Sequence, residues 1–277
     1  MTQRSRIRRT CAAALLTLAV AVGSASAADV GATVDEPVTP TPPPAGSCVH
    51  PDVADGPAVA YRWRSRVNAW RAHAVSTGTV ARRFPDAKSV SVAKLGVTTL
   101  HSSQAAWYLI LDARQIGDAC WLQVRLPAPA NNKAGWVLRD SVAAERVRWQ
   151  IEVDLSDRRV RVYAGSVLKL NAAVVVGAPS TPTPRSPVGA PFAMYDAVAG
   201  KASDFSGTWQ LATTATSPQV PSMGRVGLHG RGGASLRDAL GTARSHGCVR
   251  LANSSVSALV RMVTLPRLFG VPVVVVA

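Results

Sequence analysis

Short apolar runs alternate with turn-forming residues along residues 81–146. The runs are VSVAKLGVTTL, AWYLILDA, CWLQVRL and, after PAPANNK, AGWVL. Short strands at such intervals are typical of a small antiparallel barrel. The preceding segment, residues 48–80, holds Trp63 and Trp70 among several arginines. Its pattern assigns no element, and a helix packed on the barrel is one interpretation of it.

A second β-rich pattern occupies residues 147–277. Apolar and polar residues alternate in IEVDL (151–155) and again in VRVYA (160–164), with SDRR as a turn, which predicts a hairpin. The stretch VLKLNAAVVVG predicts a further strand, and the closing VPVVVVA predicts a buried one. Between Asn253 and Val263 apolar residues recur at helical spacing, and Asn253 or Ser254 can cap the helix.

The first 27 residues have the pattern of a secretory signal peptide. Four arginines precede an apolar run, and the small residues Ala25-Ser26-Ala27 form a cleavage site. The run is shorter than the roughly 18 to 20 residues of a spanning helix. We therefore expect an exported protein, in the cell wall or a periplasm-like space, with no stable membrane span after cleavage. A retained signal segment is the alternative.

Residues 28–47 hold five prolines and almost no large apolar residue, which predicts a semi-rigid extended spacer. Removal of residues 1–27 lowers the formal net charge from +15 to +11, because they contain four arginines and no acidic residue. No aromatic-basic nucleic-acid motif is visible, so anionic polymers outside the cell are better partners for this charge than nucleic acid. General solubility with loose electrostatic adhesion explains it equally well.

Three cysteines remain after signal removal, and an odd number leaves one unpaired. Cys48 and Cys120 both lie in the N-terminal half, so a disulfide between them would leave Cys248 free, although a sequence does not fix connectivity. An unpaired cysteine in an exported protein is open to oxidation, and such a residue more often serves chemistry than packing.

Cys248 lies in the stretch ARSHGCVRL, in a loop shortly before the expected helix. Gly247 permits a tight backbone in which the amides of His246, Gly247 and Cys248 converge on a developing oxyanion. His229, in VGLHGRGG at the end of an expected strand, is suited to take the thiol proton and return it to a leaving amine.

Two other interpretations of these residues stay open. Histidine and cysteine also bind zinc, but His229, His246 and Cys248 lack a visible fourth ligand or a Cys-x-x-Cys pair, so no metal is expected. No cofactor is expected either. In the second interpretation His229 is simply a hydrogen-bonded, partly buried residue and Cys248 is inert.

His229-Gly230, fourteen further residues and then Ser245-His246-Gly247-Cys248-Val249-Arg250 resemble the signature of the L,D-transpeptidase catalytic domain, the YkuD-type fold. The resemblance extends over roughly residues 148–277. The stretch WLQVRLPAPANNKAGWV is similar to the SH3-like barrel that accompanies this domain in some actinobacterial members. The resemblance implies a mainly β protein: a small SH3-like barrel, then a β-rich catalytic domain with a short helix after the cysteine.

The resemblance also implies an acyl transfer on peptidoglycan stem peptides. Cys248 would attack the carbonyl between the third residue, a diamino acid, and the terminal D-alanine, and the acyl group would pass to the side-chain amine of another stem as a 3→3 cross-link. His229 matches the family's base, and the Gly230 carbonyl would orient its ring. His246, Gly247 and Cys248 match the oxyanion loop, which Ser245 would shape by hydrogen bonding. Acylation of Cys248 by carbapenems is implied as well.

Arg250, the second residue after the cysteine, stands where the family has Arg or Asn, and it is suited to pair with a stem carboxylate. An intramolecular or surface ion pair is the alternative. Arg231 stands where a small hydroxyl or amide residue is common. The stretch TPTPRSPVGAPF is longer than the usual turn, which we interpret as a change at the rim of the site.

Three functions stay open: the transpeptidase, an L,D-carboxypeptidase that hands the same acyl-enzyme to water, and a non-catalytic basic wall-binding protein. A variant of the first attaches a protein to the stem. The wall-binding interpretation uses Trp107, Trp121 and Trp136 to grip glycan or peptide, but tryptophans of so small a barrel are more often core residues. We favour the transpeptidase, acting as a monomer.

Overall fold

The computed structural model describes residues 48, 61, 63, 65–128, 130–220 and 224–277. All of them belong to one compact unit, Thr41–Ala277. The expected signal peptide (1–27) and spacer (28–47) lie outside the described residues. In the described part of the chain, no helix has both the length and the hydropathy needed to cross a membrane.

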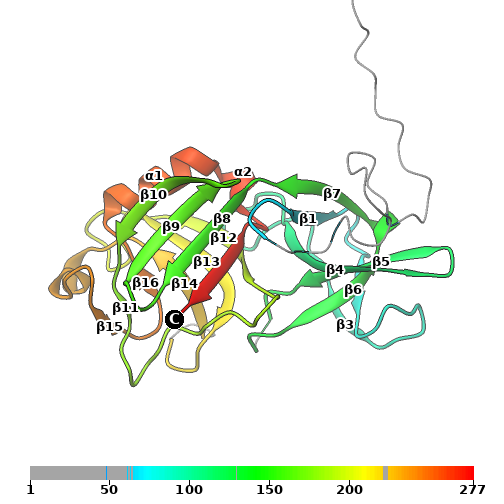
Figure 1. Cartoon of the computed structure of the whole chain (residues 1–277), viewed down its shortest axis with the longest axis horizontal. Helices are drawn as coiled ribbons and strands as arrows, with labels where there is room; N and C mark the ends of the chain where they lie inside the picture. Colours follow the sequence, from blue (N-terminus) through cyan, green and yellow to red (C-terminus); the bar gives the residue numbers. More distant parts are fainter. Residues whose placement is uncertain (1–47, 49–60, 62, 64, 129, 221–223) are drawn as a thin grey trace, which may run out of the picture. The chain divides into compact units, whose positions relative to one another are not determined.

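The N-terminal module, which we define as the described residues from 48 to 147, is built on a seven-stranded sheet with antiparallel pairing (Figure 1). Its sheet order is β3-β2-β6-β5-β4-β1-β7. The strands are β1 (Ala69–Ala74), β2 (Val80–Arg82), β3 (Ser91–Lys94), β4 (Tyr108–Ile116), β5 (Ala119–Arg125), β6 (Ala134–Leu138) and β7 (Val142–Val147), with a 3-10 turn at Arg139–Ser141. The predicted small antiparallel β-structure is confirmed.

The suggested helix within residues 48–80 is wrong for the described part, because Ala69–Ala74 forms strand β1 between β4 and β7. Trp70 on one face of β1 joins the core of the module, whereas Arg71 on the other face is also buried. A strand buried on both faces lacks the alternation by which a half-buried strand is recognised. Most of residues 49–64 lies outside the description.

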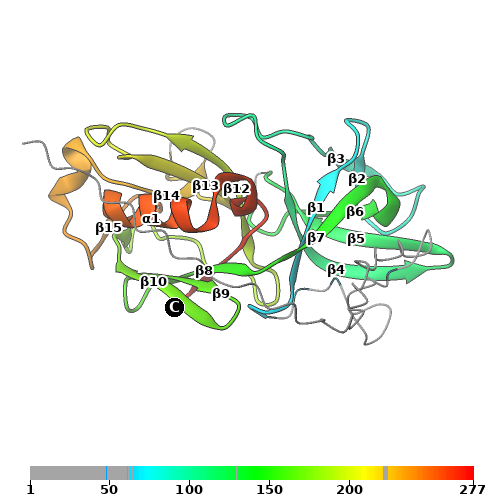
Figure 2. The same cartoon turned by 90° about the horizontal axis from the view of Figure 1, so that it is seen from above.

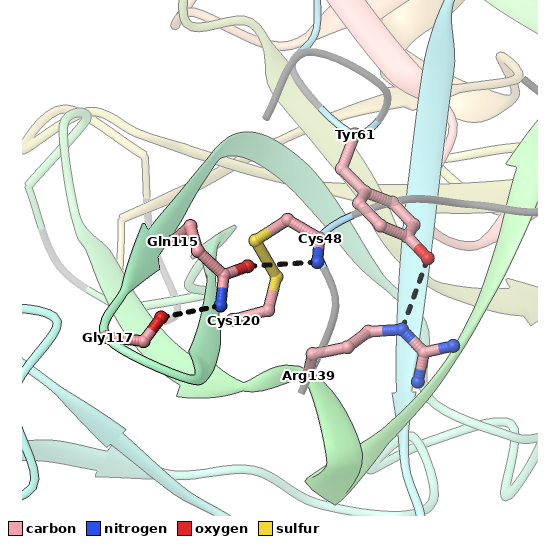
Figure 3. Close-up of a disulfide and its surroundings, with 6 residues drawn as sticks. All are labelled: Cys48, Tyr61, Gln115, Gly117, Cys120 and Arg139. Atoms are coloured by element: carbon pink, nitrogen blue, oxygen red, sulfur yellow. Dashed lines mark hydrogen bonds between the residues drawn. A yellow bond between two sulfur atoms is a disulfide. The ribbon is translucent and has the colours of Figure 1, made fainter. Parts of the chain in front are cut away.

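Cys48 and Cys120 form a disulfide (Figure 3), and Cys248 is free, as the cysteine count suggested. The backbone N–H of Cys48 donates to the side-chain oxygen of Gln115 at 3.2 Å, and Arg139 Nε donates to the hydroxyl of Tyr61 at 3.1 Å (Figure 3). These contacts fix Cys48 on β4 and β5, and Tyr61 on the 3-10 turn at Arg139–Ser141.

The C-terminal module, residues 148–277, is built on an eight-stranded sheet of order β10-β9-β8-β17-β12-β13-β14-β16. Its strands are β8 (Trp149–Asp154), β9 (Arg159–Ala164), β10 (Val167–Ala173), β12 (Phe192–Ala199), β13 (Trp209–Thr216), β14 (Arg225–His229), β16 (Val249–Arg250) and β17 (Pro272–Val276). A small parallel pair, β11 (Val176–Gly177) and β15 (Ala243–Ser245), lies apart from it. The predicted hairpin is β8–β9, and the closing valine strand is buried between β8 and β12, so both predictions are confirmed.

Helix α1 (Asn253–Val263) covers the inner face of this sheet, and the short α2 (Leu265–Leu268) follows it. In Figure 2 α1 lies between the β8–β9–β10 part of the sheet and the β12–β13–β14 part, so the sheet curls around the helix. Its buried face joins the module's main apolar core and consists of Val256, Leu259, Val260 and Val263. The helix is confirmed over the predicted residues.

Two buried arginines of the N-terminal module bond to backbone carbonyls of the C-terminal module. Arg71 Nη1 donates to the carbonyl oxygens of Pro266 and Phe269 at 2.8 and 2.6 Å. Arg125 Nε donates to Pro191 O at 3.0 Å, and burial lowers the pKa of Arg125 to about 10. Because a buried guanidinium without partners is costly, these bonds tie the two modules into one structure.

Candidate active site

His229, the predicted base, is the last residue of β14, and Cys248, the predicted nucleophile, directly precedes the neighbouring strand β16. The two strands pair in parallel, with Leu228 opposite Val249 and His229 opposite Arg250. One step earlier in this register, the backbone of Gly227 forms a hydrogen bond with Cys248. His229 and Cys248 line the same cavity, which has a volume of about 560 Å³. Residues 19 positions apart in the sequence are thus brought to one site.

His229 is buried, with 8% of its surface exposed, and its ring is fixed by its neighbour. Nδ1 lies 2.7 Å from the carbonyl oxygen of Gly230, which accepts only if the Nδ1 proton is present. Burial lowers the pKa of His229 to about 4, and the positive charge of Arg250 acts in the same direction, against the opposing effect of the Gly230 hydrogen bond. The ring is therefore neutral near pH 7, with Nε2 as its acceptor.

Cys248 is half-buried and unpaired. Burial raises the pKa of its thiol, and the hydrogen bond from Gly227 and the charge of Arg250 oppose this shift only in part. The resting pair is therefore a neutral thiol beside a neutral imidazole. A thiol in this state needs a base at the moment of attack, and a neutral histidine can act as that base.

The loop before Cys248 is held by Ser245, whose side chain is buried. Its hydroxyl donates to the carbonyl oxygen of Cys248 at 2.6 Å and accepts the N–H of Gly247 at 3.1 Å. Gly247 has φ +118°, a conformation that L side chains rarely adopt. We expected the amides of His246, Gly247 and Cys248 to converge on one oxyanion. Because the Gly247 N–H already donates to the Ser245 hydroxyl, it is not available for this role. The other two amides of this loop belong to His246, which is exposed, and to the half-buried Cys248.

Two threonines of the stretch STPTP donate hydrogen bonds to backbone carbonyls of the same loop. This role was not predicted from the sequence. Thr181 Oγ1 donates to Ser245 O at 2.8 Å, and Thr183 Oγ1 donates to Gly247 O at 2.8 Å. The stretch therefore supports the loop that carries Cys248, in addition to changing the rim of the site. The alternation of threonine and proline was the available signal, because it places hydroxyls on a stiff backbone.

Arg250 is buried, and its contacts in this structure are intramolecular. Nη1 lies 2.6 Å from Asp238 Oδ2 in an ion pair, and the guanidinium stands 4.9 Å from the ring centre of Phe205. Its Nε is buried without a hydrogen-bond partner. These contacts match the intramolecular ion pair that the sequence left open, while a substrate contact of Arg250 stays a prediction.

Asn253 positions the backbone around His229 rather than capping α1. The N-cap residue is Ala252, without a side-chain cap, so the predicted cap at Asn253 or Ser254 is wrong. Asn253 Oδ1 accepts the N–H of Arg231 at 2.9 Å, and its Nδ2 donates to Arg231 O at 2.8 Å. Oδ1 also accepts the N–H of Thr208 at 3.2 Å, so both of its lone pairs are used by residues away from the helix start.

Among the residues described, no group of three or more His, Cys, Asp and Glu side chains is arranged to hold a metal ion. His229 and Cys248 line the cavity without His246, which is exposed on the loop. The arrangement is that of a buried base beside a half-buried thiol.

Residues 148–275 match the family model of the L,D-transpeptidase catalytic domain, YkuD. This segment belongs to that family. The match covers the C-terminal module almost entirely, and both His229 and Cys248 fall within it. No curated protein sequence matches the chain.

Solved L,D-transpeptidases also resemble the chain. An L,D-transpeptidase from Mycobacterium smegmatis is 15% identical over 66% of this chain and 95% of its own, with a TM-score of 0.37. L,D-transpeptidase 3 from Mycobacterium tuberculosis is 12% identical over 65% of this chain and 94% of its own, with a TM-score of 0.40. The Ldtfm-avibactam carbamoyl enzyme is 23% identical over 47% of this chain, with a TM-score of 0.35, and the chain spans about half (49%) of its length.

Proposed function

We propose that the protein is an exported, cysteine-dependent peptidoglycan L,D-transpeptidase that forms 3→3 cross-links. The observation that carries this proposal is the pairing of a buried, neutral His229, tied through Nδ1 to Gly230, with the free thiol of Cys248 in one cavity. The membership of residues 148–275 in the catalytic-domain family supports the choice of stem peptides as substrate.

In the first half of the reaction, Sγ of Cys248 attacks the carbonyl carbon between the diamino acid at position three and the terminal D-alanine. His229 takes the thiol proton on Nε2 and delivers it to the nitrogen of D-alanine as the C–N bond breaks. The products are free D-alanine and a thioester on Cys248. His229 suits both proton transfers because it is neutral and its Nδ1 is held by Gly230, which leaves Nε2 to accept and return the proton.

In the second half, the side-chain amine of another stem's diamino acid attacks the thioester. Its proton passes to His229 and then to the departing thiolate, which restores Cys248 and leaves a new amide cross-link. The amides of His246 and Cys248 stabilise the negative oxygen in both halves, while Ser245 and Gly247 keep the loop in shape. Ser245 therefore acts by positioning.

The non-catalytic wall-binding alternative is weakened by the tryptophans it requires. Trp121 and Trp136 are each only 4% exposed, and Trp107 is partly buried beneath the guanidinium of Arg71 at 4.1 Å. Side chains buried in this way are unavailable to grip a polymer. The strong positive charge still favours loose contact with anionic wall polymers, which would keep the enzyme near its substrate.

Intact-protein mass spectrometry with a disaccharide-tetrapeptide tests the proposal. We expect loss of D-alanine and a cross-linked dimer, together with a carbapenem adduct on the peptide that contains Cys248. Tripeptide as the sole product would instead identify the carboxypeptidase, and no reaction with either reagent would overturn both enzymatic proposals.

Cys248→Ala is the decisive variant, and Cys48→Ser with Cys120→Ser is the comparison that separates chemistry from stability. The alanine variant is expected to lose acylation while it keeps the wild-type melting temperature. Turnover unaffected by Cys248→Ala would contradict the mechanism.

A further inference from the structure

The active-site cavity extends well beyond the catalytic pair. Besides His229 and Cys248, it is lined by Tyr195 and Arg225 of the C-terminal module, and by Leu100 and His101 from the β3–β4 connection of the N-terminal module. The two modules therefore share the cavity.

Arg225 is the first residue of β14, four positions before His229, and is only partly exposed. Its Nη1 donates to Thr213 O at 3.3 Å and its Nη2 donates to Pro127 O at 3.2 Å. The guanidinium stands 4.9 Å from the ring centre of Tyr195. These neutral groups orient the guanidinium, and they use fewer N–H donors than it carries.

The charge of Arg225 has no carboxylate in direct contact. In the described part of the chain, each ion pair found joins other residues. Burial lowers the pKa of Arg225, and longer-range attraction by Tyr195 and Asp196 offsets this only in part. Arg225 is thus a half-buried cation that lines the cavity and has no carboxylate partner in this structure. An anionic ligand bound in the cavity would supply that partner.

Asp196, the acidic residue that also lines this cavity, is already engaged. Its carboxylate accepts the backbone N–H groups of His101, Ser102 and Ala197 at 2.8, 3.2 and 2.8 Å, and the hydroxyl of Ser102 at 2.7 Å. The three donors from His101 and Ser102 fix the β3–β4 connection against β12, and the N–H of Ala197 holds the carboxylate within β12 itself. Asp196 thus builds the wall of the cavity and leaves the guanidinium of Arg225 available.

We propose that Arg225 binds a carboxylate of the stem peptide and so positions the stem that donates the acyl group at Cys248. This inference rests on the proposed function, because it takes the stem peptide as substrate. The planar fork of a guanidinium fits a carboxylate in two parallel hydrogen bonds. Arg250, by contrast, already has its carboxylate in Asp238.

A stem peptide offers two sources of this carboxylate: the terminal D-alanine and, where the diamino acid is diaminopimelate, its side chain. Three synthetic tetrapeptides separate them: a diaminopimelate stem with a free terminus, the same stem with a terminal carboxamide, and a lysine stem with a free terminus. Each is titrated by calorimetry into Cys248→Ala, with and without the added substitution Arg225→Gln. Binding is then measured independently of turnover.

We expect Arg225→Gln to weaken binding roughly tenfold to a hundredfold for the peptides that carry the recognised carboxylate, and to change little for the one that lacks it. Arg225→Lys keeps the positive charge but loses the planar pair of N–H donors, so its affinity for these peptides is expected to lie between those of the protein with Arg225 and of Arg225→Gln. Equal weakening of all three peptides, or of none, would overturn the proposal. The peptide that escapes the effect identifies the source of the carboxylate.

Arg83→Gln is the matched control, since Arg83 is exposed, does not line the cavity and carries the same charge. Melting temperatures of all variants exclude a general loss of folding, because Arg225 also bonds to Pro127 and Thr213. In the enzyme with Cys248 intact, KM for D-alanine release is expected to rise with kcat nearly unchanged. Selective binding without turnover in the wild type would contradict the proposed function and leave the carboxylate site standing.

Discussion

Thr183 donates its hydroxyl proton to the carbonyl oxygen of Gly247 at 2.8 Å, which joins the connection after β11 to the loop of the nucleophile. The same hydroxyl oxygen accepts the backbone N–H of Gly177 at 2.8 Å. Thr183 is buried, so water cannot replace either bond. The glycine beside Cys248, with its positive φ, is therefore held by a residue 64 positions earlier in the chain.

Thr183→Val removes this hydroxyl and keeps the shape of the side chain. We expect acylation of Cys248 by a carbapenem to slow by roughly tenfold to a hundredfold, because small displacements of a nucleophile carry such costs. Stopped-flow fluorescence or timed mass spectrometry measures the rate. Thr183→Ser keeps the hydroxyl and should stay near the wild-type rate; an equal loss in both variants would point to packing instead.

The pH profile of acylation should follow the shifted base. Because burial lowers the pKa of His229 to about 4, its neutral form is already present above that pH, and kcat/KM should rise with pH through about 4 and be flat near neutrality. An unshifted histidine would place this rise near 6.5. An inflection near 6.5 in the wild type would contradict the assignment of a buried neutral base.

The same shift makes stability depend on pH. His229 has a lower pKa in the folded state than in the unfolded chain, so the unfolded state binds more protons between about pH 4 and 6.5. The free energy of unfolding should therefore fall by roughly 3 kcal/mol from this residue as pH drops through that window. Urea titrations of the wild type and His229→Gln at several pH values measure the difference, which should shrink in the variant.

Asp238→Asn tests whether Arg250 has a structural role, through its ion pair with Asp238, or binds the substrate. If the ion pair is structural, its loss leaves the buried guanidinium without its anion and lowers the free energy of unfolding by about 1.5 to 3 kcal/mol. Arg250→Met should then cost stability with little change in KM for the stem peptide. A rise in KM at unchanged melting temperature would assign Arg250 to the substrate after all.

Removal of the disulfide should act on folding and spare the chemistry. Cys48 and Cys120 are 72 residues apart, and closing a loop of that length typically stabilises a protein by about 2 to 4 kcal/mol. The double serine variant should lose that much in urea unfolding and still form the carbapenem adduct on Cys248. Loss of the adduct under native conditions would show that the N-terminal module shapes the cavity more strongly than expected.

The β8–β9 hairpin, the closing strand β17 and helix α1 of the C-terminal module followed from local patterns, whereas β12 and β13 were not predicted. The β8–β9 hairpin alternates strictly, β17 is a β-branched run, and α1 repeats its apolar residues at helical spacing. In the hairpin and in α1 the regularly spaced apolar residues face the core, and in β17 a continuous apolar run is mostly buried. Strand β1 broke this rule, since Arg71 is buried on its second face by carbonyls nearly 200 positions away.

The sequence by itself indicated the candidate chemistry: an odd number of cysteines after signal removal, a histidine that accompanies Cys248, and the family that their spacing resembles. These are properties of residue type and order. The tertiary structure decided what lies around them, because Thr183, Asp238 and Arg225 reach the site through contacts that no local pattern encodes. It also decided the charge states, since burial holds His229 neutral and Cys248 protonated. Desolvation depends on the atoms packed around a group, and only the folded chain fixes those.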